Sequence, residues 1–186
     1  MVPEVKTILF VTDLSQSSRH AFYYAASVAS FYRAKIDILY PMEDIQGSMK
    51  NYIFGLLGDE LYKKYEEKKA DHARSVLIGK EKDSTRVQRA LEILSDDSIE
   101  KLREDKRLVK QMIIKNKETD VTEEIHHQCQ NEHYDMIVAS YKCFTELHDL
   151  RAGSKIRKTM KMTNIPLLLV PATDEESADE AIEEEE

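Results

Sequence analysis

The residues with the clearest chemical potential lie in a loop-like segment near the end of the sequence. Ser140 and Cys143 follow the apolar run 136–139, and Gly153 and Ser154 come after nine further residues. A glycine and a serine at a helix start present backbone N–H groups and a hydroxyl, which bind phosphate oxygens. The spacing therefore predicts a site for a phosphate chain between two strands. Ser140 and Cys143, however, stand where glycines would let a ligand approach the backbone closely.

Other reactive residues give weaker predictions. His126, Cys129 and His133 fall in one short segment, but Cys129 continues an apolar helix face and no second ligand pair has standard spacing, so we expect no metal site. Cys143 is either a redox-sensitive thiol, if Lys142 lowers its pKa, or a plain small residue of the loop. The sequence lacks G-x-x-x-x-G-K-[S/T] and G-x-S-x-G, so we expect no enzyme, with weak ATP hydrolysis at most.

Five short apolar runs predict the strands that would position these residues. Continuous apolar and β-branched runs are typical of strands buried on both faces. Segments with helical spacing separate them, and strands joined by a crossover helix should be parallel. The alternation predicts an open, doubly wound α/β sheet. The expected strands are 7–12, 35–40 (ended by Pro41), 108–114, 134–139 and 166–170.

The stretch 43–107 is too long for a simple crossover between the second and third strands. Apolar residues at helical spacing predict one helix around 57–65 and a second around 87–102, with a break at 79–83. We interpret this stretch as a helical insertion. It could form a hairpin, cover the cleft, bind a partner or simply pack on the sheet.

Composition indicates one globular domain with an acidic appendage. The 186 residues are 41% apolar, which is enough for a buried core. The net charge is −8, but residues 173–186 hold nine acidic residues and no basic one, leaving 26 acidic against 27 basic elsewhere. We therefore expect a nearly neutral domain over 1–172 and a disordered acidic tail over 173–186. The tail is either a solubility appendage or a contact for a partner.

Several classes of protein do not fit this sequence. Two cysteines make no disulfide framework, and no secretory signal or membrane-length apolar run occurs, so a cytoplasmic protein without a membrane partner is expected. Basic residues are scattered and aromatic residues do not interleave with them, so we expect no nucleic-acid binding.

Four motifs follow one another in a familiar order. Residues 13–21 fit D-x-S-x-x-S-x-x-A, residues 135–138 resemble D-L-I-V, the spacing of 140–154 resembles G-x-x-G-x(9)-G-[S/T], and residues 166–171 resemble P-V-L-V-V-P. Over 5–42 and 108–172 the sequence thus resembles the universal stress protein family. The resemblance implies an adenine-nucleotide-hydrolase-like fold, in which a five-stranded parallel sheet of order 3-2-1-4-5 has helices on both faces.

The resemblance also implies a nucleotide site at the carboxyl ends of the first and fourth strands. Asp13 would lie beside the adenosine, Pro41 at the adenine edge, Ser140 and Cys143 against ribose and phosphates, and Gly153 and Ser154 on phosphate oxygens. Pro41 has no N–H to offer adenine. Ser140 and Cys143 add side chains where the backbone should be accessible. ATP is therefore possible but disfavoured, and the cofactor is unknown.

Family members dimerise through the last strand, which implies that Leu167, Leu168, Leu169 and Val170 pair with a second copy. An apolar edge strand would otherwise remain bare. We expect a homodimeric stress-response or regulatory binding protein with a degenerate nucleotide cleft. The alternative is an ATP-binding, weakly hydrolytic signalling switch. The helical insertion and the acidic tail are candidate contacts for a protein partner.

Overall fold

A five-stranded parallel sheet forms the centre of the molecule. The computed structural model describes residues 4–42, 48–75, 82–102, 108–116, 120–144 and 152–171. Neighbouring strands all pair in parallel, in the order β3-β2-β1-β4-β5, which confirms the predicted sheet. The strands are β1 (Thr7–Val11), β2 (Lys35–Met42), β3 (Val109–Asn116), β4 (Met136–Ser140) and β5 (Leu167–Val170).

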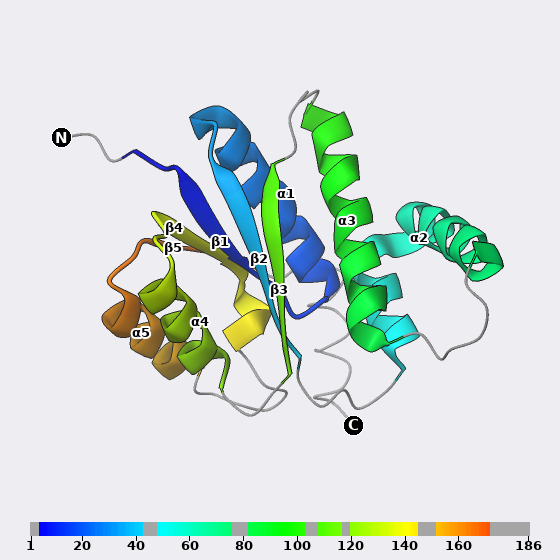
Figure 1. Ribbon diagram of the computed structural model, residues 1–186. Coiled ribbons are helices and arrows are strands. Elements are labelled where there is room, and N and C mark those ends of the chain that lie inside the picture. Colours follow the sequence, from blue (N-terminus) through cyan, green and yellow to red (C-terminus); the bar gives the residue numbers. More distant parts are fainter. Residues whose placement is uncertain are drawn as a thin grey trace.

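Helices cover both faces of the sheet (Figure 1). One face carries α1 (Gln16–Tyr32) and α3 (Asp83–Leu102), with α2 (Met49–Ser75) beside them; the other carries α4 (Val121–Asn131) and α5 (Ala152–Thr163). A short 3-10 turn, η1 (Tyr141–Phe144), follows β4 directly. The carboxyl ends of the strands therefore meet at one edge, where the β1–α1 loop and η1 lie side by side.

The alternation of side chains along the strands divides the core into two layers. Phe10 and Val138 face α1, whereas Leu9 and Ile137 face α4 and α5. Small residues let α1 lie close to the sheet, and its Phe22 packs edge-on against Phe10 with ring centroids 5.1 Å apart. Each fully buried side chain of this size contributes roughly 1.5–3 kcal/mol, so both layers fix the sheet edge that carries the candidate site.

Two helices, α2 and α3, lie between β2 and β3. α3 packs on α1 and β3 as a crossover helix would, and α2 packs outside it on α3 and α1. α2 is kinked at Gly58, where the backbone adopts φ 67° and ψ 178°. The positive φ favours glycine, and a Cβ there would meet the flexible end of the Arg19 side chain of α1, which would have to move aside. The predicted break at 79–83 falls largely outside the described residues, and α3 begins at Asp83.

The prediction that Pro41 ends the second strand is wrong. β2 continues to Met42, and Pro41 pairs in register with Lys115 of β3. Leu39 accepts a hydrogen bond from Thr12 N on the β1 side, and backbone groups two residues apart along a strand point the same way. The nitrogen of Pro41 therefore points past the end of β1, where no ladder hydrogen bond is lost.

Candidate functional site

The β1–α1 loop turns sharply at the carboxyl end of β1. Leu14 adopts a left-handed conformation (φ 65°), which is unfavourable for a non-glycine residue by roughly 1–2 kcal/mol. Its completely buried side chain and a 3.0 Å hydrogen bond from its N–H to Thr12 Oγ1 hold this turn. Asp13 Oδ1 accepts from Ser15 N at 2.9 Å, so the Asp13 carboxylate is fixed at the mouth of the loop.

Ser18 links this loop to the end of β4. Its hydroxyl donates to Asp13 Oδ1 at 2.5 Å and accepts from Asp13 N at 3.3 Å. The same oxygen lies 3.5 Å from Ser140 Oγ and 3.7 Å from Cys143 Sγ. A hydroxyl has one proton, and that of Ser18 goes to Asp13, so Ser18 acts as an acceptor toward Ser140. Ser18 and Ser140 are completely buried.

Cys143 completes this cluster from η1. Its thiol donates to the carbonyl oxygen of Val11 at 3.5 Å and lies 3.4 Å from Ser140 Oγ. The side chains at the two positions expected to be glycine are thus joined to β1 and α1 by hydrogen bonds. They occupy the space through which a ligand would approach the backbone. We call Asp13, Ser18, Ser140 and Cys143 the serine–cysteine cluster.

The environment of Cys143 does not favour a reactive thiol. Burial, followed by the nearby Asp13 carboxylate, raises the pKa of Cys143 to about 12. The contacts with Ser140 and Ser18 lower the pKa, but they offset only part of this rise. A thiolate is the reactive form, so Cys143 is a poor nucleophile near neutral pH.

The remaining predicted site residues lie around this cluster rather than in it. Pro41 is buried at the end of β2, on the same sheet edge as Asp13. Gly153 and Ser154 are exposed in the first turn of α5, which packs against η1. A Cβ placed on Gly153 would meet nothing within 4 Å among the described residues. The first helical turn leaves N–H groups without intrahelical partners, so this position is open to an anion.

Sequence reasoning did not single out Ser18 as a site residue. The signal was present, because Ser18 is the second serine of the D-x-S-x-x-S pattern that begins at Asp13. The pattern alone did not show that this hydroxyl would contact Ser140 and Cys143, which lie more than a hundred residues away. The serine and carboxylate lack an imidazole partner within the cluster, and Ser18 is inaccessible, so the arrangement positions the loop rather than activating a nucleophile.

The model of the Universal stress protein family matches residues 4–171. The chain belongs to this family. The comparison with curated protein sequences finds no match.

Solved structures of the family share the fold of this universal stress protein. UspA from Lactobacillus plantarum aligns with a TM-score of 0.56 and 14% identity, over 90% of this chain and 98% of that chain. A universal stress family protein from Arabidopsis thaliana with AMP bound aligns with a TM-score of 0.52 and 12% identity, over 95% and 98% of the two chains. At such low identity, the likeness concerns the fold alone.

The side chains of the histidine segment, 126–133, lie against separate partners. His126 lies 2.9 Å from Gln130, and His133 lies 3.3 Å from Asp135, so the two rings have different partners. Cys129 packs on the core, and burial raises its pKa to about 11. No group of three or more metal-ligating side chains occurs in the described part of the chain.

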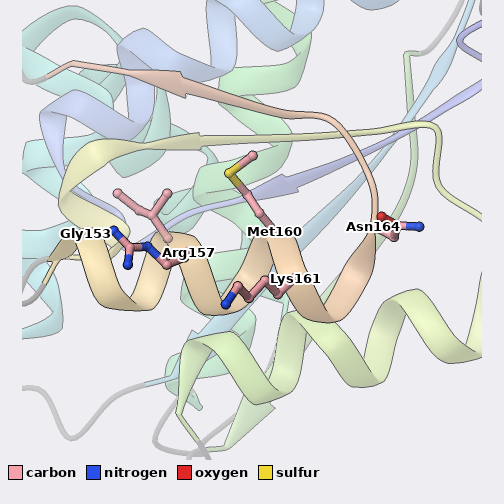
Figure 2. Close-up of a pocket in the computed structure, with 6 residues that line it drawn as sticks. Gly153, Arg157, Met160, Lys161 and Asn164 are labelled. Carbon is pink, nitrogen blue, oxygen red and sulfur yellow. The ribbon is translucent and has the colours of Figure 1, made fainter.

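The outer surface of α5 carries two shallow depressions. One shallow depression is lined by Gly153, Ile156, Arg157, Met160, Lys161 and Asn164, as Figure 2 shows. A second depression on the same helix includes Ser154, Arg157 and Lys161. The surface that begins at the predicted phosphate position therefore continues along a basic helix.

Of the helices in the described residues, none is long and apolar enough to cross a bilayer.

Proposed function

We propose that this universal stress protein is a homodimeric regulatory binding protein of the cytoplasm, with a nucleotide cleft that no longer accepts ATP in the manner of the family's ATP-binding members. The observation that carries the proposal is the serine–cysteine cluster. Ser140 and Cys143 direct side chains into hydrogen bonds with α1 and β1 where such a cleft needs bare backbone. We expect slow ATP hydrolysis at most.

The cluster opposes nucleotide binding for two reasons. Ligand phosphates would have to displace buried side chains, and each buried polar group left without a partner costs about 1–3 kcal/mol. The Asp13 carboxylate is already engaged by Ser15 N and the Ser18 hydroxyl. Its oxygens are therefore only partly available to a ribose or an adenine.

The edge strand β5 supports the homodimer. It pairs only with β4 among the described strands, and its leucines are partly exposed. Met160 of α5, which is 53% exposed, is directed toward the strands in Figure 2. A second copy pairing along β5 would cover both the backbone edge and these apolar side chains. Phe54 of α2 is a further exposed apolar group, on the helical segment that we propose as a surface for a protein partner.

The second candidate function is an ATP-binding switch with weak hydrolysis. One observation favours it: Gly153 and Ser154 are exposed at the start of α5, and no described residue lies within 4 Å of a Cβ built on Gly153. The phosphate end of the site would then remain usable even though the cluster fills the ribose end.

Calorimetric titration with ATP separates the two functions. The wild type should bind ATP weakly or not at all, and Ser140→Gly combined with Cys143→Gly should raise the affinity at least about tenfold, or roughly 1.4 kcal/mol. The gain should come from restored access to the backbone. Circular dichroism should first establish that the double variant is folded, because it loses buried hydrogen bonds.

A matched control distinguishes backbone access from the loss of hydrogen bonds. Ser140→Ala combined with Cys143→Ala removes the same polar groups but keeps a Cβ at each position, so it should show no comparable gain. A low-micromolar dissociation constant for ATP in the wild type would contradict the degenerate cleft and favour the switch.

A further inference from the structure

Helix α5 has the largest positive excess of any helix that the structure describes. It carries four Lys or Arg residues and no Asp or Glu. Lys158 lies 3.4 Å from Glu123 of α4 and is therefore partly neutralised. Arg157 and Lys161 are exposed and form no ion pair with another described residue. We call the surface formed by Arg157 and Lys161, with Ser154 at its start, the α5 basic face.

The most acidic part of the chain begins beside this face. Residues 173–186 hold nine acidic and no basic residues. Because β4 and β5 are parallel and α5 connects them, α5 runs antiparallel to both strands. Its first turn thus lies at the sheet edge where β5 ends at Val170. Figure 2 shows Gly153 at one end of α5 and Asn164 at the other, where the chain turns toward β5.

The acidic segment is long enough to follow the helix. The 12 residues of α5 span about 18 Å at 1.5 Å per residue. The 15 residues after Pro171 reach roughly 50 Å when extended. The segment is tethered at the end of β5, on the same sheet edge as the start of α5, so its effective concentration at that surface is high and favours even weak ionic contacts. The dipole of α5 adds a positive field at Ser154.

We propose that residues 172–186 of this chain dock on its own α5 basic face through ionic contacts with Arg157 and Lys161. The docked segment lies across the depression that includes Ser154, Arg157 and Lys161, and it brings carboxylates toward Ser154. The inference concerns the domain and its own tail, and it holds whether or not ATP binds in the cleft.

The test uses the full-length chain with a nitroxide on Ser177→Cys, without nucleotide. The native cysteines have raised pKa values, about 11 for Cys129 and about 12 for Cys143, so they should react more slowly than the new thiol. Paramagnetic broadening should weaken the amide NMR signals of 153–161 by about half or more at low salt, and spare those of α2. Roughly 0.5 M salt should restore the signals, because it screens exposed charges beyond a few ångströms.

Charge reversal gives the matched control. Arg157→Glu with Lys161→Glu should abolish the broadening of α5. Lys63→Glu with Lys64→Glu changes the net charge equally but lies on α2, and should leave the broadening in place. Equal broadening of all helices, or broadening that persists after reversal on α5, would overturn the proposal.

A mixed sample identifies whose tail is docked. An isotope-labelled chain without nitroxide is combined with an unlabelled chain that carries it. Little broadening is expected, because the nitroxide then belongs to another molecule. Broadening of α5 as strong as in the single-chain sample would assign the contact to a second copy and overturn docking by the chain's own tail.

Discussion

At the scale of single residues, two side chains determine the properties of the site, because they occupy positions where glycine would leave the backbone accessible. Ser140 and Cys143 are bound to α1 and β1 through Ser18 and Val11, so they contribute to the packing of the sheet edge. The exposed Gly153, by contrast, could be replaced by alanine without disturbing the fold, because a Cβ there would contact no described residue. The two ends of the predicted phosphate site therefore have different physical roles.

The thiol of Cys143 should react slowly with alkylating reagents. Its pKa is raised to about 12 by burial and by Asp13, so near pH 8 very little thiolate is present. Alkylation by iodoacetamide, followed by mass spectrometry, should be at least about tenfold slower in the folded chain than in urea. The half-buried Cys129, with a pKa of about 11, serves as the internal comparison.

The same shift gives a pH dependence with a definite sign. The unfolded thiol has the lower pKa, so as pH rises it releases its proton first and the unfolded state is favoured. The contribution of the Cys143 thiol to the free energy of unfolding is fully present below about pH 9 and declines toward pH 12.

The alkylation experiment could also contradict this description of the thiol. Rapid alkylation of folded Cys143 near neutral pH would instead indicate an activated, redox-sensitive thiol.

At the scale of elements, apolar periodicity was sufficient to predict all five strands, whereas the order of the sheet was predicted from the resemblance to the universal stress protein family. Strands buried on both faces have a strong local signal, which does not depend on distant contacts. The kink at Gly58 was not predicted, because a glycine inside a helical pattern does not by itself show that the helix bends there. The continuation of β2 through Pro41 was not predicted. A proline is accommodated there because β1 ends before the position where it would need a hydrogen bond from residue 41, and the sequence of β2 alone does not show this. Local patterns thus gave the elements, and contacts between strands decided where β2 ends.

The edge strand β5 carries the prediction of a dimer. Leu168→Lys places a charge in the middle of this strand, which would be desolvated if a second copy paired there. Light scattering at micromolar concentration should show a dimer for the wild type and a monomer for the variant, with an unchanged circular dichroism spectrum. Phe54→Lys adds the same charge on an exposed apolar residue of α2 and should remain dimeric. A monomeric wild type would refute the dimer.

At the scale of the whole molecule, charge is divided between a nearly neutral domain and an acidic end. The net charge of −8 arises from the last residues, since removal of their nine carboxylates leaves +1. The candidate cleft, the edge strand and the α5 basic face all meet the carboxyl edge of one sheet, from which this acidic segment departs. A change in ionic strength should therefore alter the contacts of the tail more than it alters the fold.

The last prediction is that deletion of residues 174–186 changes the melting temperature little. The deleted segment has few apolar side chains to bury, and exposed ion pairs of the kind proposed with Arg157 and Lys161 contribute about 0–1 kcal/mol. For a chain of this size, 1 kcal/mol corresponds to a shift of about 2–4 °C. Differential scanning calorimetry at low and high salt should show a small decrease at low salt that disappears when salt screens the contact. A decrease of more than about 4 °C that persists at high salt would mean that the segment buries apolar surface as part of the fold. The tail would then be an element of the domain rather than a segment held on α5 by ionic contacts alone.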